Sequence, residues 1–416
     1  MSLNRVRLPP EVEAANRTLN RNDSLAVGVV NAAAPFLPVL LVRLGASGIA
    51  VGLVTAIPAV AGALLALPIG RRLQRRQDIV PAYSRSRLIA HTIYAPIALV
   101  LLLVPLDWAV AAILVLWAFA MVPNTIGQVA FPIVMDGAAG SRGRYDLLGR
   151  RWAIIGLVTA VTMAAGGQLL RLLPFPTNYE LFMLVCASGG IGSFYFARRY
   201  VIPAQVPEDA STSRSPAARI GEMVAHLRSE RSFTTFEIRA LVYSAGIGLA
   251  APLLPLFYVK EVIASDAVVG LIGAGQSLGA LAGYVTWRLI SRRFGRAYVL
   301  MPSLLLSALT PAAFFAIHDQ VLVVIVSVAA GFASAGAGLA LFDEMMRRIP
   351  TRLGVTFASI DQTIQNAALI VAPIVGGTLS GLIGIRNALV VAALVSLAGF
   401  AFFVLDLYNE RTRVPA

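Results

Sequence analysis

Uncharged amide side chains interrupt several long apolar stretches of this sequence. Asparagine and glutamine donate and accept hydrogen bonds but cannot change charge. Polar groups in such stretches are costly in lipid, so they face a cavity or another helix. A polar cavity formed this way would suit a neutral or weakly polar solute, whereas the alternative is that the amides bond only to neighbouring helices. The candidate binding residues are Asn31, Asn124, Gln128, Gln276, Gln365 and Asn366.

One carboxylate, Asp361, lies several residues inside an apolar stretch, four residues before Gln365. Residues four apart share a helix face. Partial removal from water favours the neutral form of a carboxyl group. Asp361 is therefore the candidate for coupling transport to protons. The alternative is that it stays ionised and pairs with an inner-loop arginine such as Arg150 or Arg151.

Catalytic and metal-binding patterns are missing from the sequence. The single cysteine, Cys186, excludes an internal disulfide, and His91, His226 and His318 are widely separated. No serine–histidine pairing or phosphate-binding glycine loop occurs. The sequence predicts no cofactor, no metal and no enzymatic activity.

The composition is that of a membrane protein. Of the 416 residues, 58% are hydrophobic and only 13% are charged, against roughly 25% charged in soluble domains. The charges lie between long apolar windows, each close to the ~20 residues that a membrane-spanning helix needs. These windows are 25–42, 44–70, 88–106, 108–135, 152–170, 181–197, 240–259, 267–287, 297–318, 320–342, 362–385 and 387–405.

The net charge of +13 reflects topology rather than nucleic-acid binding. With the N-terminus inside, 30 of the 34 lysines and arginines fall on the inner side. This positive-inside bias predicts cytoplasmic N- and C-termini in a multi-pass protein of the plasma (inner) membrane. The exceptions are Arg43, Arg171, Lys260 and Arg386.

The sequence contains a weak internal repeat. Residues 33–39 (AAPFLPV) return as 250–256 (AAPLLPL), and residues 51–54 (VGLV) return as 269–272 (VGLI). An offset of half the chain in an apolar protein is typical of transporters with two equivalent halves. Pro35 and Pro252 are expected to occupy equivalent places, where each bends its helix near the cavity.

Five segments follow from these patterns. Asn22, Asp23 and Ser24 are predicted to cap the first spanning helix. Residues 136–151 are predicted to form an inner loop. Residues 216–230 are predicted to form an amphipathic helix on the inner membrane face. The segments are a cytoplasmic N-terminal segment (1–22), an N-terminal six-helix bundle (23–200), a cytoplasmic linker (201–233), a C-terminal six-helix bundle (234–406) and a cytoplasmic tail (407–416).

Six spans on either side of a long inner loop resemble the major facilitator superfamily along essentially the whole chain. The family signature after the second helix is Gly-x-x-x-Asp-Arg-x-Gly. Gly70 and Arg75 match it, whereas Gln74 replaces the aspartate. A second signature, Gly-Pro-x-x-Gly-Gly in the fifth helix, is linked with antiporters in the family. Here the fifth helix keeps Gly166-Gly167 but has Thr162-Met163 in place of Gly-Pro, and the near-complete form, residues 372–377 (APIVGG), lies in the eleventh helix instead. The resemblance implies an all-α membrane fold, with two six-helix bundles related by pseudo-two-fold symmetry that rock about a central site.

A cytoplasmic gate is predicted next to the two arginine clusters. Arg75 is expected to pair with Asp136, and Arg293 with Asp343. Exposed pairs contribute only about 0–1 kcal/mol each. A network over both halves can still bias a balanced equilibrium between two conformations.

The function predicted from these observations is transport of a small organic solute by alternating access, with efflux of a neutral or amphiphilic compound as the leading interpretation. The expected partners are the small-molecule substrate, membrane lipids and protons, with no nucleic acid, and the expected state is a monomer. A lipid or lysolipid translocase on the same fold is the nearest alternative. A polytopic membrane enzyme or sensor is the alternative from a different class.

Overall fold

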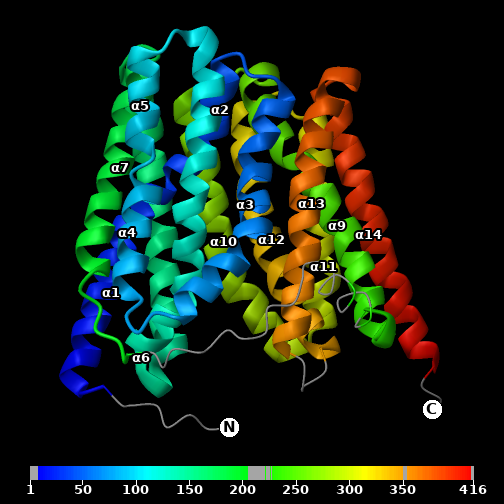
Figure 1. The fold of residues 1–416 in the computed structure, drawn as a ribbon. Coiled ribbons are helices and arrows are strands. Elements are labelled where there is room, and N and C mark those ends of the chain that lie inside the picture. Colours follow the sequence, from blue (N-terminus) through cyan, green and yellow to red (C-terminus); the bar gives the residue numbers. More distant parts are fainter. Residues whose placement is uncertain (1–7, 205–220, 222–224, 226, 350–353, 414–416) are drawn as a thin grey trace. The chain divides into compact units, whose positions relative to one another are not determined.

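The computed structural model describes residues 8–204, 221, 225, 227–349 and 354–413 (Figure 1). All regular secondary structure in these ranges is helical, which confirms the predicted fold class. The predicted amphipathic helix at 216–230 falls mostly outside the described residues.

The helices of the first half of the sequence precede the linker. They are α1 (Pro10–Asn31), α2 (Ala33–Arg43), α3 (Gly48–Gln74), α4 (Val80–His91), α5 (Tyr94–Leu103), α6 (Leu106–Leu172) and α7 (Thr177–Ala197). The second half has a short π-helix and a short 3₁₀ turn besides its α-helices. Its elements are α9 (Arg231–Leu256), η1 (Phe257–Glu261), α10 (Asp266–Phe294), α11 (Ala297–Ala313), η2 (Phe314–Ala316), α12 (Gln320–Arg348), α13 (Gly354–Ile383) and α14 (Ile385–Arg413).

Twelve helical stretches within the described ranges are long and apolar enough to cross a membrane, as predicted. α1 joins α2 in one span and α4 joins α5 in another, whereas α6 contains two spans, Leu106–Ala139 and Leu147–Leu172. Bulky apolar side chains remain exposed on them, including Leu103 and Phe119, both at 73%. Such surfaces promote aggregation in water, whereas the hydrocarbon of a bilayer covers them.

The first spanning helix begins earlier than predicted. The cap at Asn22–Ser24 is wrong, because α1 begins at Pro10, and Asp23 and Ser24 are buried in its interior. Proline suits the first turn of a helix, where its missing N–H would be unpaired anyway. The polar residues at 22–24 were therefore a signal of buried polar contacts rather than of a helix start.

The two copies of the repeat differ at their prolines. α1 ends at Asn31 and α2 begins at Ala33. Pro35 explains this break, because it offers no N–H to the carbonyl of Asn31 and its ring crowds that carbonyl. α9 instead continues through Pro252 and becomes irregular only in η1.

The segment 136–151 was predicted as a loop, but α6 continues through it. It contains no proline, and its charged residues do not prevent helix formation. Polarity marked the edge of the apolar span here, not the end of the helix.

Two compact units can be separated by their internal contacts. Unit 1 contains residues 1–44, 60–211 and 265–274, and unit 2 contains 45–59, 212–264 and 275–416. Each unit thus takes a short segment from the other half of the sequence. α3 and α10 are the helices that these divisions cut.

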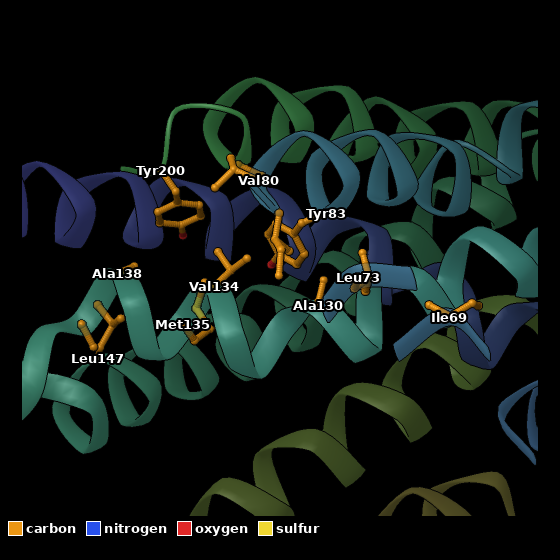
Figure 2. Packing of buried hydrophobic residues seen from close by; sticks show 13 residues of the cluster. Ile69, Leu73, Val80, Tyr83, Ala130, Val134, Met135, Ala138, Leu147 and Tyr200 are labelled. Carbon is orange, nitrogen blue, oxygen red and sulfur yellow. The ribbon is translucent and has the colours of Figure 1, made fainter. Parts of the chain in front are cut away.

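The core of unit 1 forms where α1, α4, α6 and α7 pack against one another. Figure 2 shows one cluster of this core, with Tyr83 and Tyr200 beside the small and branched side chains of α6. Ala130 and Ala138 are fully buried there. Small residues allow close approach of helices, which stabilises packing between helices in lipid.

The core of unit 2 is formed mainly by α9 with α13 and α14, and by α11 with α12 and α14. Aromatic pairs link these helices. The ring centroids of Phe233 and Phe357 lie 4.7 Å apart in a T-shaped arrangement, and those of Phe236 and Phe403 lie 6.1 Å apart. Both pairs have the edge-to-face geometry that aromatic rings favour.

Candidate functional site

A buried ion network joins three helices of unit 1. Asp23 of α1 accepts hydrogen bonds from Arg87 of α4 at 2.9 Å and from Arg151 of α6 at 2.8 Å. The Asp23 side chain is completely buried, and the two arginine side chains are 7% and 3% exposed. Buried charges of this kind are tolerated only when they are paired and hydrogen-bonded.

Neutral polar groups complete the network. Ser193 donates to the second oxygen of Asp23 at 2.7 Å, and Asn20 accepts from Arg151 at 2.9 Å. Arg87 also donates to the hydroxyl of Tyr83, and Tyr200 donates to Asn20 at 3.2 Å. The network therefore fixes the relative positions of α1, α4, α6 and α7 within unit 1.

Sequence reasoning missed this network. Arg87 and Arg151 were assigned to inner loops, and Asp23 to a helix cap, because each lies just outside an apolar window. The sequence pattern that could have predicted this network is one carboxylate and two arginines, each at the edge of a different apolar span. The Arg151 guanidinium thus donates hydrogen bonds to Asp23 and Asn20.

Two carboxyl groups meet in unit 2. Glu237 of α9 and Asp361 of α13 lie within hydrogen-bonding reach of each other, and Asp361 also contacts Gln365. Glu237 is 2% exposed, and neither of its oxygens accepts a hydrogen bond from a donor among the described residues. Glu237 was missed from the sequence because it precedes the apolar window at 240–259.

A cavity of about 280 Å³ opens among the helices of unit 2. No charged residue lines it, and neutral polar groups lie among its apolar residues. Gln276 is the predicted binding residue that reaches it. The other polar residues of the lining are Tyr258, Ser307, Thr310, Ser327 and Ser334.

The six predicted amides divide equally between the units. In unit 1, Asn31 is the last residue of α1, Asn124 donates to the sulfur of Met121 at 3.7 Å, and Gln128 is exposed. In unit 2, Asn366 accepts from Gln362 at 3.2 Å, one turn along α13. Gln365 thus lies beside Asp361, whereas Gln276 lies in the cavity.

Within unit 1, the first residue of α10 contacts two helices of the first half of the sequence. Asp266 accepts from Arg43, the last residue of α2, at 2.9 Å, and from the hydroxyl of Tyr179 on α7 at 2.8 Å. Arg43, which was predicted at the outer face, is only partly exposed in this pair. The contact holds the start of α10 in unit 1.

Paired glycines give close helix contacts in both units. A Cβ on Gly167 of α6 would lie 2.8 Å from the Asp266 carbonyl oxygen, and a Cβ on Gly377 of α13 would lie 2.2 Å from the Gly48 carbonyl oxygen of α3. The preceding glycines contact helices of their own half of the sequence. Gly166 packs against Phe182 of α7, and Gly376 packs against Leu249 of α9. The antiporter-like motif at 372–377 therefore serves helix packing here.

Three of the predicted gate residues lie at or near a helix end, whereas Asp136 lies in the interior of α6. Arg75, Arg293 and Asp343 are exposed, and Arg293 lies over the ring of Phe294 at 5.3 Å. The ion pairs of this part of unit 2 instead join Glu344 to Arg296 and to Arg348, both at 2.6 Å. Pairing of Arg75 with Asp136 and of Arg293 with Asp343 stays a prediction.

Comparison with known proteins agrees with this architecture. Residues 238–416 match the family model described as Major Facilitator Superfamily. A variant of the nucleoside transporter NupG has a TM-score of 0.71 at 15% identity, covering 94% of this chain and 99% of that chain. A bacterial homologue of the human lysosomal transporter Spinster has a TM-score of 0.68 at 14% identity, covering 95% and 96%.

A bacterial homologue of the iron transporter ferroportin is also similar, with a TM-score of 0.66 at 13% identity, covering 95% of this chain and 98% of that chain. No curated protein sequence matches the chain significantly. At these identities the structural likeness concerns the fold.

The twelve candidate spans and this fold are those of a multi-pass membrane protein. The second half of the chain, residues 238–416, thus matches the major facilitator superfamily model, and the fold of the whole chain is similar to that of the solved transporters.

Proposed function

We propose that this protein exports an uncharged or amphiphilic small organic solute across the cell membrane, with both termini in the cytoplasm. The observation that carries the choice of solute is the cavity of unit 2, which combines neutral hydrogen-bonding side chains with apolar walls and has no charged residue in its lining. A solute with a fixed charge would lose its hydration there without a counter-charge.

Gln276 is the binding residue with the strongest support, because its amide reaches this cavity. Asn31, Asn124, Gln128, Gln365 and Asn366 are proposed to complete the solute path. The similarity to a nucleoside transporter makes an uncharged nucleoside a reasonable first probe.

A ligand-dependent stability screen of the purified full-length protein tests the proposal. The panel is uridine as a neutral polar solute, N-phenyl-1-naphthylamine as a neutral amphiphile, succinate as an anion, and Mn²⁺ as a metal ion. A ligand that binds only the folded state stabilises it by RT ln(1 + [L]/Kd), so the melting temperature rises with the ligand concentration.

We expect uridine or the amphiphile to stabilise the protein and succinate and Mn²⁺ to have no effect. The stabilising compound is then loaded into inverted membrane vesicles to measure its direction of movement. Stabilisation by succinate or Mn²⁺ alone would contradict the proposed solute class.

A further inference from the structure

The pair Glu237–Asp361 brings two acidic side chains together, and its hydrogen bond requires a proton on one of them. Its two carboxyl groups come from different helices, α9 and α13, which pack against each other in the core of unit 2. A hydrogen bond between two carboxyl groups exists only when one of them carries a proton, because ionised carboxylates can only accept. Two adjacent carboxylates also repel each other, which disfavours ionisation of both.

No described cation compensates this pair. Arg348 of α12 lies with its guanidinium 5.7 Å from the ring centre of the neighbouring Phe236, but it is hydrogen-bonded to Glu344. Arg239 is two residues from Glu237 and therefore points to a different face of α9. The electrostatic neighbour of Glu237 is Asp361 itself, and that of Asp361 is Glu237 together with the neutral Gln365.

The remaining charged groups of the packed helices lie elsewhere. Arg296 is bound to Glu344, and Arg386 at the start of α14 is bound to Glu261. Arg231, the first residue of α9, is exposed. The described surroundings of the pair are therefore neutral or acidic.

We propose that Glu237 and Asp361 share one proton and that this proton is exchanged for the solute in each transport cycle, an inference that rests on the proposed function. Asp361 is partly exposed, so it is the member of the pair that exchanges the proton with water. Glu237 is buried and holds the proton when Asp361 is ionised. Release transfers the proton from a carboxyl O–H to a water molecule and leaves a carboxylate.

The position of the pair connects proton binding to helix packing. Glu237 lies near the start of α9, next to the buried Phe236, and Asp361 lies next to the buried Ile360 on α13. Loss of the proton would place two negative charges in this core, and like charges disfavour close packing of α9 and α13. Protonation would thus favour one packing of these helices over another, which is what coupling requires.

The first test needs no solute. Infrared spectra of the full-length protein in lipid nanodiscs report protonated carboxyl groups through their C=O absorption. We expect such an absorption at neutral pH, its loss in the double variant Glu237→Gln/Asp361→Asn, and its loss in Glu237→Gln alone, since the remaining Asp361 is partly exposed. In Asp361→Asn the band should persist at a shifted frequency, because Glu237 stays buried.

The control is Asp107→Asn, which removes an exposed carboxyl group in the first turn of α6. It should leave the band as in the wild type. Absence of the band in the wild type, or its persistence in the double variant, would overturn the proposal. Neither outcome depends on the identity of the solute, so a failure here is separate from a failure of the proposed function.

The second test uses the compound that stabilises the protein in the screen. In proteoliposomes, the double variant should exchange this compound at equal pH at the wild-type rate, within about twofold, but lose accumulation driven by a pH gradient. Accumulation that persists in the double variant, or that is driven by a sodium gradient at equal pH, would show that the pair does not carry the coupling proton.

Discussion

Asp23 and Arg151 lie 2.8 Å apart, oxygen to nitrogen, with both side chains withdrawn almost completely from solvent. They belong to α1 and α6, and their residue numbers differ by more than a hundred. Because Arg87 binds the same carboxylate oxygen, one aspartate is the counter-charge shared by two guanidinium groups at this point. The stability of unit 1 should therefore depend on Asp23 more than on either arginine.

The variant Asp23→Asn should strongly destabilise the protein. It leaves two buried arginines without a counter-charge, and removal of one partner of a buried pair costs about 3–5 kcal/mol. The melting temperature of the purified protein in detergent measures this effect. The matched control is Glu13→Gln, which removes an exposed partner of Arg17 at 3.8 Å and should cost less than about 1 kcal/mol. Equal shifts in the two variants would argue against a structural role of the network.

Sequence patterns predicted the fold better than the polar contacts. Hydropathy and the positions of the arginines depend on the bilayer, whose thickness and lack of water leave few alternatives to spanning helices. The twelve spans follow from this. Breaks such as the one at Ala32 follow from a single proline, and Pro252 shows that the same residue type need not interrupt a helix.

The ionic contacts could not be predicted because they depend on which helices become neighbours. Asp23 and Glu237 each lie at the edge of an apolar window, where a charged residue is ordinary. Their burial depends on the packing of α1 with α6 and of α9 with α13. Asp361 was predicted as a coupling residue from its place along one helix, but its partner Glu237 lies on another.

The pair Arg43–Asp266 should stabilise the attachment of α10 to α2. Asp266→Ala and Arg43→Ala should each lower the melting temperature, and the double variant should cost less than the sum of the two. Residues in one hydrogen-bonded network show coupling energies of about 0.5–3 kcal/mol in such a cycle. Additive shifts would mean that the two side chains contribute independently.

Gln276 should contribute to solute binding through its amide. Gln276→Ala removes a hydrogen-bonding group from the cavity lining, and a typical net hydrogen bond is worth about 0.5–1.5 kcal/mol. Binding of the compound selected in the stability screen should weaken by roughly 2- to 13-fold, as measured by titration of the melting temperature. Thr235→Ala, on an exposed face of α9, serves as the control and should bind as the wild type.

The proposed orientation can be tested with single cysteines in a Cys186→Ala background. Thr177→Cys lies at the exposed start of α7 and should react with a membrane-impermeant thiol reagent in intact cells. Gln77→Cys lies in the exposed segment after α3 and should react only after permeabilisation. Asn178 is less suitable, because it is buried and donates to the Leu170 carbonyl at 2.8 Å. The reverse labelling pattern would invert the topology.

The contact of α3 with α13 should be sensitive to one added methyl group. In Gly52→Ala, the new Cβ would lie 2.6 Å from the carbonyl oxygen of Pro373, so the two backbones must separate. Overpacking of this kind costs about 1–3 kcal/mol, and we expect a lower melting temperature together with slower transport. Gly338→Ala on α12 is the matched control, because its Cβ would meet nothing within 4 Å. Since alanine favours a helix over glycine by up to about 1 kcal/mol, this variant should be neutral or slightly stabilised. If Gly52→Ala behaves like Gly338→Ala, the close approach of α3 to α13 does not limit stability or transport.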